Sequence, residues 1–274
     1  MIDNIRISKK LVDLVTPKVM SILNCTPDSF YEGSRVDSIS DALFRAEKHI
    51  HEGADILDIG GYSSRPGADE VSENEELNRV ISVIESVHKT FPEILISCDT
   101  FRGKVASEAL GAGAHLINDI SGGEIDPSIL QVVSNFQCPY ILMHSKGTPQ
   151  TMQNLTNYNS IFKEVVTYFS QKLSVLQKLG INDVILDPGF GFAKTLEQNY
   201  ELFHRMADFQ FLGKPILVGI SRKSMIYKKI NCTPEESLNG TTVLHTKAIL
   251  SGAKILRVHD TKEAKQVIQL IKEN

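Results

Sequence analysis

The chain alternates short apolar runs with amphipathic helical stretches about eight times, and this alternation limits the folds open to it. Runs such as residues 94–99 and 184–187 are mainly apolar and end in an acid, and continuous apolar runs are typical of strands buried between helices in a parallel sheet. About eight strand-and-helix units in about 250 residues predict a (β/α)8 TIM barrel. A doubly wound open sheet is the alternative.

The predicted elements follow one another without a low-complexity linker, so we expect a single domain over residues 1–274. Residues 2–16 alternate polar and apolar side chains and predict a short N-terminal β-hairpin extension. Strands are predicted at residues 19–24, 55–61, 94–99, 115–119, 139–144, 184–187, 215–220 and 254–260. Helices are predicted at residues 40–51, 72–90, 104–111, 128–135, 161–180, 235–251 and 262–271.

Charge and composition restrict the partners and the compartment. A net charge of −4 argues against nucleic acid or an anionic membrane as the principal partner. No run approaches the ~18 apolar residues of a membrane span, and the N-terminus lacks the apolar segment of a secretory signal. The four cysteines are far apart and show no zinc-ligand spacing, so we expect free thiols. These features predict a soluble cytoplasmic protein.

Polar side chains end nearly every predicted strand. In a TIM barrel the carboxyl ends of all eight strands meet at one face, where the active site lies. Amide, acid and base at so many strand ends favour a site over chance. The residues expected to converge there are Asn24, Asp58, Asp99, Asn118, Met143, Asp187, Lys223 and Arg257.

Three of these side chains predict recognition of a flat heterocycle. Asp99, Asn118 and Asp187 present acceptors, or mixed donors and acceptors, suited to an N–H edge. Pro188 and Gly189 begin a rigid loop that frames Asp187. Glycoside hydrolysis also uses paired carboxylates, but it explains neither the amide nor the cations nearby.

A cationic group predicts a phosphate subsite. It comprises Arg65, Arg222, Lys223, Arg257 and His259, and the last four lie at strands seven and eight, the usual phosphate location of TIM barrels. Surface salt bridges are the alternative. Asn24 and Thr26 are placed to face the same anion, with Mg²⁺ bridging oxygen ligands to it.

Other motifs are excluded or left open. Gly189 and Gly191 follow a strand, but Lys194 occupies the third glycine position of the dinucleotide fingerprint. The phosphate-binding G-x-x-x-x-G-K-[ST] motif is absent. His144 at a strand end is either a general base or a hydrogen-bonded structural residue.

Taken together and in order, these motifs resemble the dihydropteroate synthase family of folate biosynthesis. The matching segments are residues 22–30, 58–61, 64–67, 99–100, 118–120, 143–144, 186–192, 221–224 and 257–260. The resemblance implies an enzyme that joins 6-hydroxymethyl-7,8-dihydropterin diphosphate to 4-aminobenzoate and releases pyrophosphate. It implies loss of the diphosphate before the arylamine attacks, and Mg²⁺ as cofactor.

The resemblance also implies residue roles. Those implied to hold the pterin are Asp99, Asn118, Asp187 and Lys223, with Arg257 over its face and Ile120, Met143 and Phe192 lining the pocket. Those implied to take the diphosphate are Asn24, through Mg²⁺, with Ser64, Arg65, Arg257 and His259. Those implied for the aminobenzoate pocket, which sulfonamides also enter in this family, are Phe30, Pro66, Lys223 and Ser224. Charge stabilisation at both ends makes Lys223, Arg257, His259, Asp99 and Asp187 the expected catalytic residues.

The chain departs from the family pattern at three positions. Tyr62 stands where the family often has Glu, and Ser64 replaces Thr but keeps a hydroxyl. Glu32 replaces Asp in the first loop, and its longer side chain puts a role as metal ligand in doubt. A pterin-binding corrinoid methyltransferase and a non-catalytic pterin-binding protein are the alternative functions. A homodimer is expected, because barrels of this kind often pair through outer helices.

Overall fold

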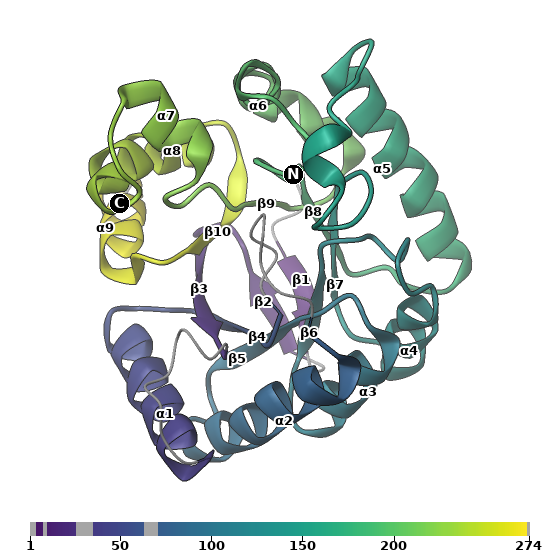
Figure 1. The fold of residues 1–274 in the computed structure, drawn as a ribbon, viewed down its shortest axis with the longest axis vertical. Coiled ribbons are helices and arrows are strands. Elements are labelled where there is room, and N and C mark those ends of the chain that lie inside the picture. Colours follow the sequence, from purple (N-terminus) through teal and green to yellow (C-terminus); the bar gives the residue numbers. More distant parts are fainter. Residues whose placement is uncertain (1–3, 8–9, 26–34, 63–70, 273–274) are drawn as a thin grey trace.

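The barrel is closed by eight parallel strands in the order β10-β3-β4-β5-β6-β7-β8-β9, as the TIM-barrel prediction requires (Figure 1). The computed structural model describes residues 4–7, 10–25, 35–62 and 71–272, and of residues 35–38 only the backbone. The strands are β3 (Lys18–Asn24), β4 (Ile56–Gly60), β5 (Leu95–Asp99), β6 (Leu116–Asp119), β7 (Tyr140–Met143), β8 (Val184–Asp187), β9 (Ile216–Val218) and β10 (Ala253–Val258).

Helices form the outer ring. They are α1 (Arg35–His51), α2 (Glu73–Thr90), α3 (Gly103–Gly111), α4 (Ser128–Phe136), α5 (Ile161–Lys178), α6 (Leu196–His204), α7 (Ser224–Ile230), α8 (Leu238–Leu250) and α9 (Thr261–Ile271). Short 3-10 turns are η2 (Met152–Asn154), η3 (Met206–Leu212) and η4 (Glu235–Ser237). In the described part of the chain, no helix has the length and apolarity needed to cross a membrane.

Each strand buries both faces, and the two faces do different things. Side chains alternate along a strand, so Leu57 and Ile59 of β4 pack against the helices while Ile56 and Asp58 point into the barrel. Cys98 lies on the helix side and Asp99 on the barrel side, as alternation predicts. The interior-facing residues nearest the strand starts are apolar: Met20, Ile56, Leu116, Ile141, Ile185, Leu217 and Ile255.

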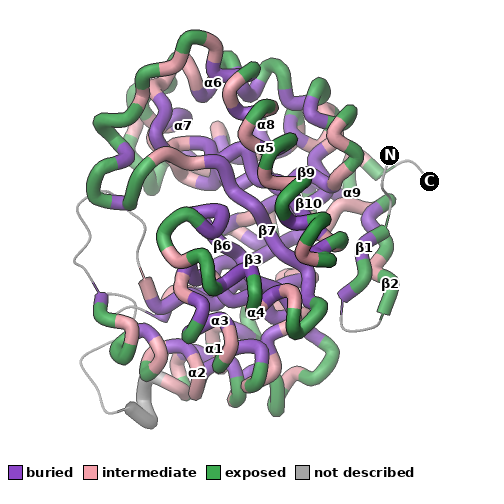
Figure 2. The backbone as a smooth tube through the Cα atoms, turned by 90° about the vertical axis from the view of Figure 1, so that its right-hand side faces the viewer, coloured by how far each residue is buried: buried purple, intermediate pink, exposed green. Residues whose placement is uncertain are grey.

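The predicted N-terminal hairpin is present and closes one end of the barrel. β1 (Asn4–Ile7) pairs antiparallel with β2 (Lys10–Asp13). Ile5, Ile7 and the nearby Leu14 are buried against the apolar interior layer at the strand starts. Figure 2 shows the hairpin beside that end of the barrel. Polar groups in the interior therefore face the other end.

Two helices were not predicted. α6 lies between β8 and β9, and Thr195 caps it: the hydroxyl accepts from Gln198 N while the Gln198 side chain accepts from Thr195 N. α7 is a short extra helix between β9 and α8. Strand seven is shorter than predicted, since only Ile216–Val218 pairs as strand.

Candidate active site

The strand-end residues converge at the open end of the barrel. Asp58, Asp99, Asn118 and Arg257 come from β4, β5, β6 and β10, and hydrogen bonds join all four. Asp187 ends β8, beside Met143 at the end of β7 in the parallel register. Up to 199 positions of sequence separate residues that touch here. The predicted cluster is therefore a real spatial group.

Arg257 lies at the centre of this polar network. Its Nε donates to Asp58 Oδ2 at 2.6 Å, and its Nη2 donates to Asp99 Oδ2 at 2.5 Å. The amide nitrogen of Asn118 donates to the same Asp58 oxygen at 3.0 Å. Because its N–H group is turned to Asp58, Asn118 offers its carbonyl oxygen as an acceptor to a further group.

Burial and the pairing of opposite charges shift the pKa values of this network in opposite directions. Burial raises the pKa of Asp99, and the nearby Asp58 carboxylate adds to that rise, whereas Arg257 opposes it. Burial alone would lower the pKa of Arg257, but Asp58 and Asp99 outweigh it and raise that pKa. Arg257 thus stays charged, and its charge keeps two buried carboxylates together.

Asp187 and Lys223 form the second half of the cluster. The Asp187 carboxylate is 6% exposed and accepts the backbone N–H of Gly189 at 2.8 Å. Burial raises its pKa, while the Lys223 charge opposes the rise. Burial lowers the pKa of Lys223 to about 8, with Asp187 opposing. A desolvated acid and a desolvated base face the same space, a typical feature of functional sites.

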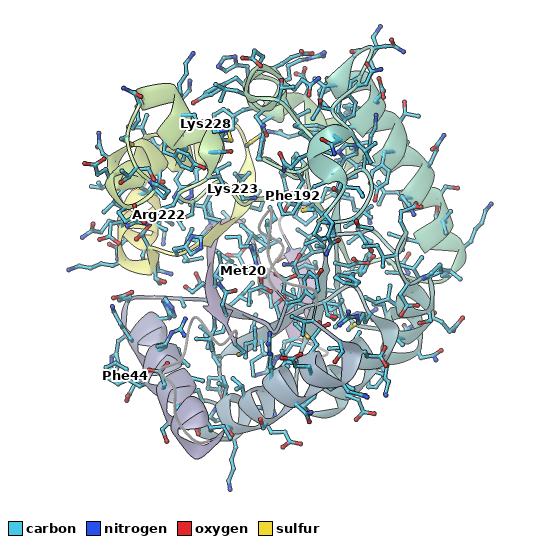
Figure 3. All side chains as sticks on the ribbon, viewed as in Figure 1. Met20, Phe44, Phe192, Arg222, Lys223 and Lys228 are labelled. Atoms are coloured by element: carbon cyan, nitrogen blue, oxygen red, sulfur yellow. The ribbon has the colours of Figure 1, made fainter. Side chains whose placement is uncertain are left out.

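The loop after β8 supplies partners for Lys223. Its ammonium donates to the Phe190 carbonyl at 2.8 Å and lies 4.5 Å from the centroid of the Phe192 ring. Figure 3 shows Lys223 and Phe192 close together at the upper side of the ring of strands, with Met20 below them. The ammonium is therefore held over the aromatic face of Phe192.

Apolar side chains form a wall beside the polar side chains of the strand-end cluster. Phe101, Ile120 and Met143 form a separate buried cluster, against which Tyr62 and Phe192 pack. The Tyr62 and Phe101 rings meet edge to face at 5.1 Å between centroids, and Gln150 Nε2 donates to the Tyr62 hydroxyl at 2.7 Å. Acceptors on one side and apolar side chains on the other suit a flat, polar-edged ring.

Arg222 does not belong to the cationic cluster that the sequence predicted. Its guanidinium makes two bonds to Asp260, at 2.9 and 2.8 Å, and further bonds to the carbonyls of Pro234 and Glu235. Its backbone is left-handed, with φ of 54°, so the side chain turns away toward the start of α8. These contacts favour the salt-bridge alternative for Arg222 over a role as a phosphate ligand.

Other predicted site residues are placed as follows. Asn24 ends β3, next to β10 in the sheet. His259 directly follows β10, is exposed, and its Nδ1 lies 3.2 Å from Ser221 Oγ. Ser224 begins α7. Phe30, Ser64, Arg65 and Pro66, with Thr26 and Glu32, lie outside the described residues.

His144 faces the helices and not the cluster. It is 2% exposed and its ring meets Tyr168 of α5 edge to face at 5.0 Å. Burial lowers its pKa well below the ordinary value. This environment favours the structural alternative over a general base.

Two residues that shape the site had no role assigned from the sequence. Asp58 was placed at a strand end, but its bonds to Arg257 and Asn118 depend on closure of the barrel. Lys194 breaks a glycine motif in the sequence, and in the structure its side chain is buried near Asp187. A lysine inside an otherwise apolar and glycine-rich stretch was the available signal.

Comparison with known proteins agrees with this geometry. Residues 20–259 match the family model described as pterin binding enzyme. The dihydropteroate synthase of Escherichia coli K12 is 44% identical over 262 residues, covering 95% of this chain and 92% of the relative.

Two solved structures are also similar. The Yersinia pestis dihydropteroate synthase, in complex with a sulfonamide drug, superimposes with a TM-score of 0.91 at 38% identity, covering 97% of each chain. The Xanthomonas albilineans dihydropteroate synthase with 4-aminobenzoic acid gives a TM-score of 0.90 at 34% identity, over 98% of this chain and 96% of that one. The chain therefore belongs to the dihydropteroate synthases, within the family of pterin-binding enzymes.

Proposed function

We propose that the strand-end cluster condenses 6-hydroxymethyl-7,8-dihydropterin diphosphate with 4-aminobenzoate, giving 7,8-dihydropteroate and pyrophosphate. The chain is a dihydropteroate synthase, and that is the reaction of this enzyme. One observation supports the assignment of residues. The acceptor side chains at the ends of β5, β6 and β8 lie around the same space as Lys223, Arg257 and the apolar wall.

Asp99, Asn118 and Asp187 read the N–H edge of the pterin. A carboxylate accepts two parallel N–H bonds from such an edge, and the Asn118 carbonyl oxygen adds a third acceptor. Lys223 donates to the ring acceptors, and Ile120, Met143 and Phe192 line its faces. Arg257 lies over the ring, since its guanidinium already spans the interior from Asp58 to Asp99.

The diphosphate lies toward β3 and β10. Arg257 and His259 leave the end of β10, and Asn24 ends the neighbouring strand β3. Ser64 and Arg65 complete this subsite in the proposal. A cation and hydrogen-bond donors at this end stabilise the negative charge that grows on the departing diphosphate.

The donor set near β3 fits Mg²⁺. This ion keeps several waters and takes one or two protein oxygens together with substrate phosphates, so a full protein cage is not required. Asn24 offers a carbonyl oxygen, and the described residues hold no group of three His, Cys, Asp or Glu that would make a closed site for another metal. When bound, Mg²⁺ supplies charge neutralisation to the diphosphate.

The protein stabilises both charges of a dissociative step. As the bond from methylene to oxygen breaks, positive charge spreads over the pterin, where Asp99 and Asp187 face it. The amine of 4-aminobenzoate then adds to the methylene, which needs position more than a strong base. Lys223 and Ser224, with Phe30 and Pro66, form the pocket for this second substrate. The similar Xanthomonas albilineans enzyme binds 4-aminobenzoic acid, which supports that pocket.

We expect the purified protein to release pyrophosphate when given the pterin diphosphate, 4-aminobenzoate and Mg²⁺. Omitting 4-aminobenzoate should lower dihydropteroate formation to background, as measured by chromatography of the product. Tight binding of the pterin without product would favour the non-catalytic pterin-binding protein. Methyl transfer from a folate to a corrinoid would favour the alternative methyltransferase.

Asn24→Ala is expected to raise the Mg²⁺ concentration for half-maximal turnover by at least about tenfold, because one oxygen ligand is lost. The backbone of Asn24 keeps its pairing with Gly60, so the barrel should fold normally. Turnover is measured against Mg²⁺ concentration after treatment with a chelator, with affinity for a pterin lacking the diphosphate as the control. An unchanged Mg²⁺ dependence would exclude Asn24 as a ligand.

The homodimer and the cytoplasmic location stay predictions. Val243, Leu250 and Leu270 are exposed apolar side chains on α8 and α9, with exposed fractions of 52%, 72% and 88%. They are a surface through which two barrels would pair by outer helices.

A further inference from the structure

Lys194 is a buried lysine whose hydrogen bonds all go to backbone carbonyls. It is 5% exposed, and its ammonium donates to Gly189 O at 2.8 Å, Phe192 O at 2.9 Å and His144 O at 3.3 Å. An ammonium has three protons, so these bonds use all of its donors. Two of the acceptors are in the loop between β8 and α6, and the third directly follows β7.

This loop needs an outside constraint. Gly189, Gly191 and Ala193 have φ of 68°, 84° and 49°, so three residues in five adopt left-handed backbone. Ala193 has no glycine freedom and adopts that conformation at a cost of roughly 1–2 kcal/mol. A Cβ on Gly189 would lie 2.0 Å from His144 O, so the loop also passes very close to the end of β7.

The same loop positions three parts of the pterin site. Gly189 N–H donates to Asp187, and the Phe190 carbonyl accepts from Lys223. The Phe192 ring packs against the apolar wall of the site. Lys194 binds the carbonyls on either side of Phe190, so it holds the segment that supplies these contacts.

We propose that Lys194 is a positioning residue for the pterin site, which tethers the β8–α6 loop to the end of β7 and so fixes Asp187, Lys223 and Phe192 for ligand binding. It acts through these groups and does not touch the ligand. This inference rests on the proposed function of the Asp187 cluster.

Burial lowers the pKa of Lys194 to about 7, so its charge is present as the solution is acidified and has a second effect there. The cations facing Asp187 are Lys223 before α7, Arg257 of β10 and Lys194, and all three oppose the rise in its pKa that burial causes. Lys194 itself faces Asp187, Lys223 and Lys146, and its contact His144 is held neutral by burial. Removing the Lys194 charge should therefore raise the pKa of Asp187, so that pterin affinity is lost at a higher pH as the solution is acidified.

Lys194→Met tests the proposal, because Met fills similar volume without donors or charge. Binding of 6-hydroxymethylpterin is measured by calorimetry from pH 5 to pH 8. We expect the dissociation constant at pH 8 to rise about tenfold or more, and the acid midpoint of binding to move to higher pH. Lys214→Met is the control, since Lys214 also donates to a loop carbonyl, Asn182 O at 2.8 Å, but at the opposite end of the barrel.

Lys194→Gln separates the two effects and serves if the Met variant does not fold. Gln keeps N–H donors in the same space without the charge, so the acid midpoint should still move while affinity at pH 8 falls less. A folded variant with wild-type affinity and an unchanged acid midpoint would overturn the inference. Failure of the wild-type protein to bind the pterin would instead overturn the proposed function.

Discussion

Asp187→Asn is expected to lower kcat/KM for the pterin diphosphate by about 10²–10⁴ without unfolding the protein. Hydrogen bonds to a charged group contribute about 1.5–3 kcal/mol each, and a carboxylate that accepts two of them loses about 3–6 kcal/mol when it becomes an amide. The amide also turns a donor toward donors on the ligand. Steady-state kinetics with varied pterin diphosphate measure the change.

The same substitution should leave stability unchanged or raise it. Burial raises the pKa of Asp187 in the folded state, so its stabilising contribution is full below the unfolded pKa and is lost as pH rises through the folded pKa. At pH 7 the wild-type protein bears the cost of the buried charge, and the neutral Asn does not. Asn can still accept the Gly189 N–H. Urea unfolding at pH 7 and pH 5 should show the difference shrinking on acidification.

Asp183→Asn is the matched control. Asp183 precedes the same strand at the opposite end of the barrel, where it accepts from Arg6 N at 3.1 Å and is 22% exposed at its side chain. Its loss should cost under about 1 kcal/mol of stability and leave kcat/KM unchanged. A normal kcat/KM for Asp187→Asn would mean that Asp187 does not accept hydrogen bonds from the pterin edge.

Local pattern was sufficient for the barrel because each strand is buried on both faces and most of the long helices have an apolar stripe. α6 was missed although its capping box, Thr195 with Gln198, is visible in the sequence. Its buried apolar residues, Leu202 and Phe203, are few, and the glycine-rich segment before it is typical of a long loop. The exact length of strand seven depends on which of its backbone groups form hydrogen bonds with neighbouring strands, and no local sequence pattern predicts this.

The candidate site was predictable where strand ends alone place the residue, and not where a side chain must choose a partner. Asp99, Asn118 and Asp187 were found because parallel strands end at one face. The pairing of Arg222 with Asp260 was not predictable, because its left-handed backbone is not apparent from a strand pattern. The role of Asp58 depends on β10 closing against β3, beside β4.

Asp58→Asn is expected to reduce the free energy of unfolding by about 2–4 kcal/mol and kcat/KM by roughly 10². The Asp58 side chain is fully buried, and one oxygen accepts from both Arg257 and Asn118. An amide at this position keeps the shape of the side chain but loses its charge. Of the two carboxylates that pair with Arg257, only Asp99 then remains. Urea unfolding and steady-state kinetics measure the two losses.

Ser97→Ala is the control for Asp58→Asn, because Ser97 lies beside Asp58 in the parallel register and is equally buried. Among the described residues its hydroxyl has no hydrogen-bond partner, so its removal should change neither stability nor rate by much. Combining Asp58→Asn with Asn118→Ala should cost less than the sum of the two single changes, by about 0.5–3 kcal/mol, since the first removes the charge from the acceptor of the Asn118 bond and the second removes its donor. Strict additivity of the free-energy changes would mean that Asp58 does not orient the Asn118 amide. Another contact would then orient the Asn118 carbonyl oxygen that is proposed to bind the pterin.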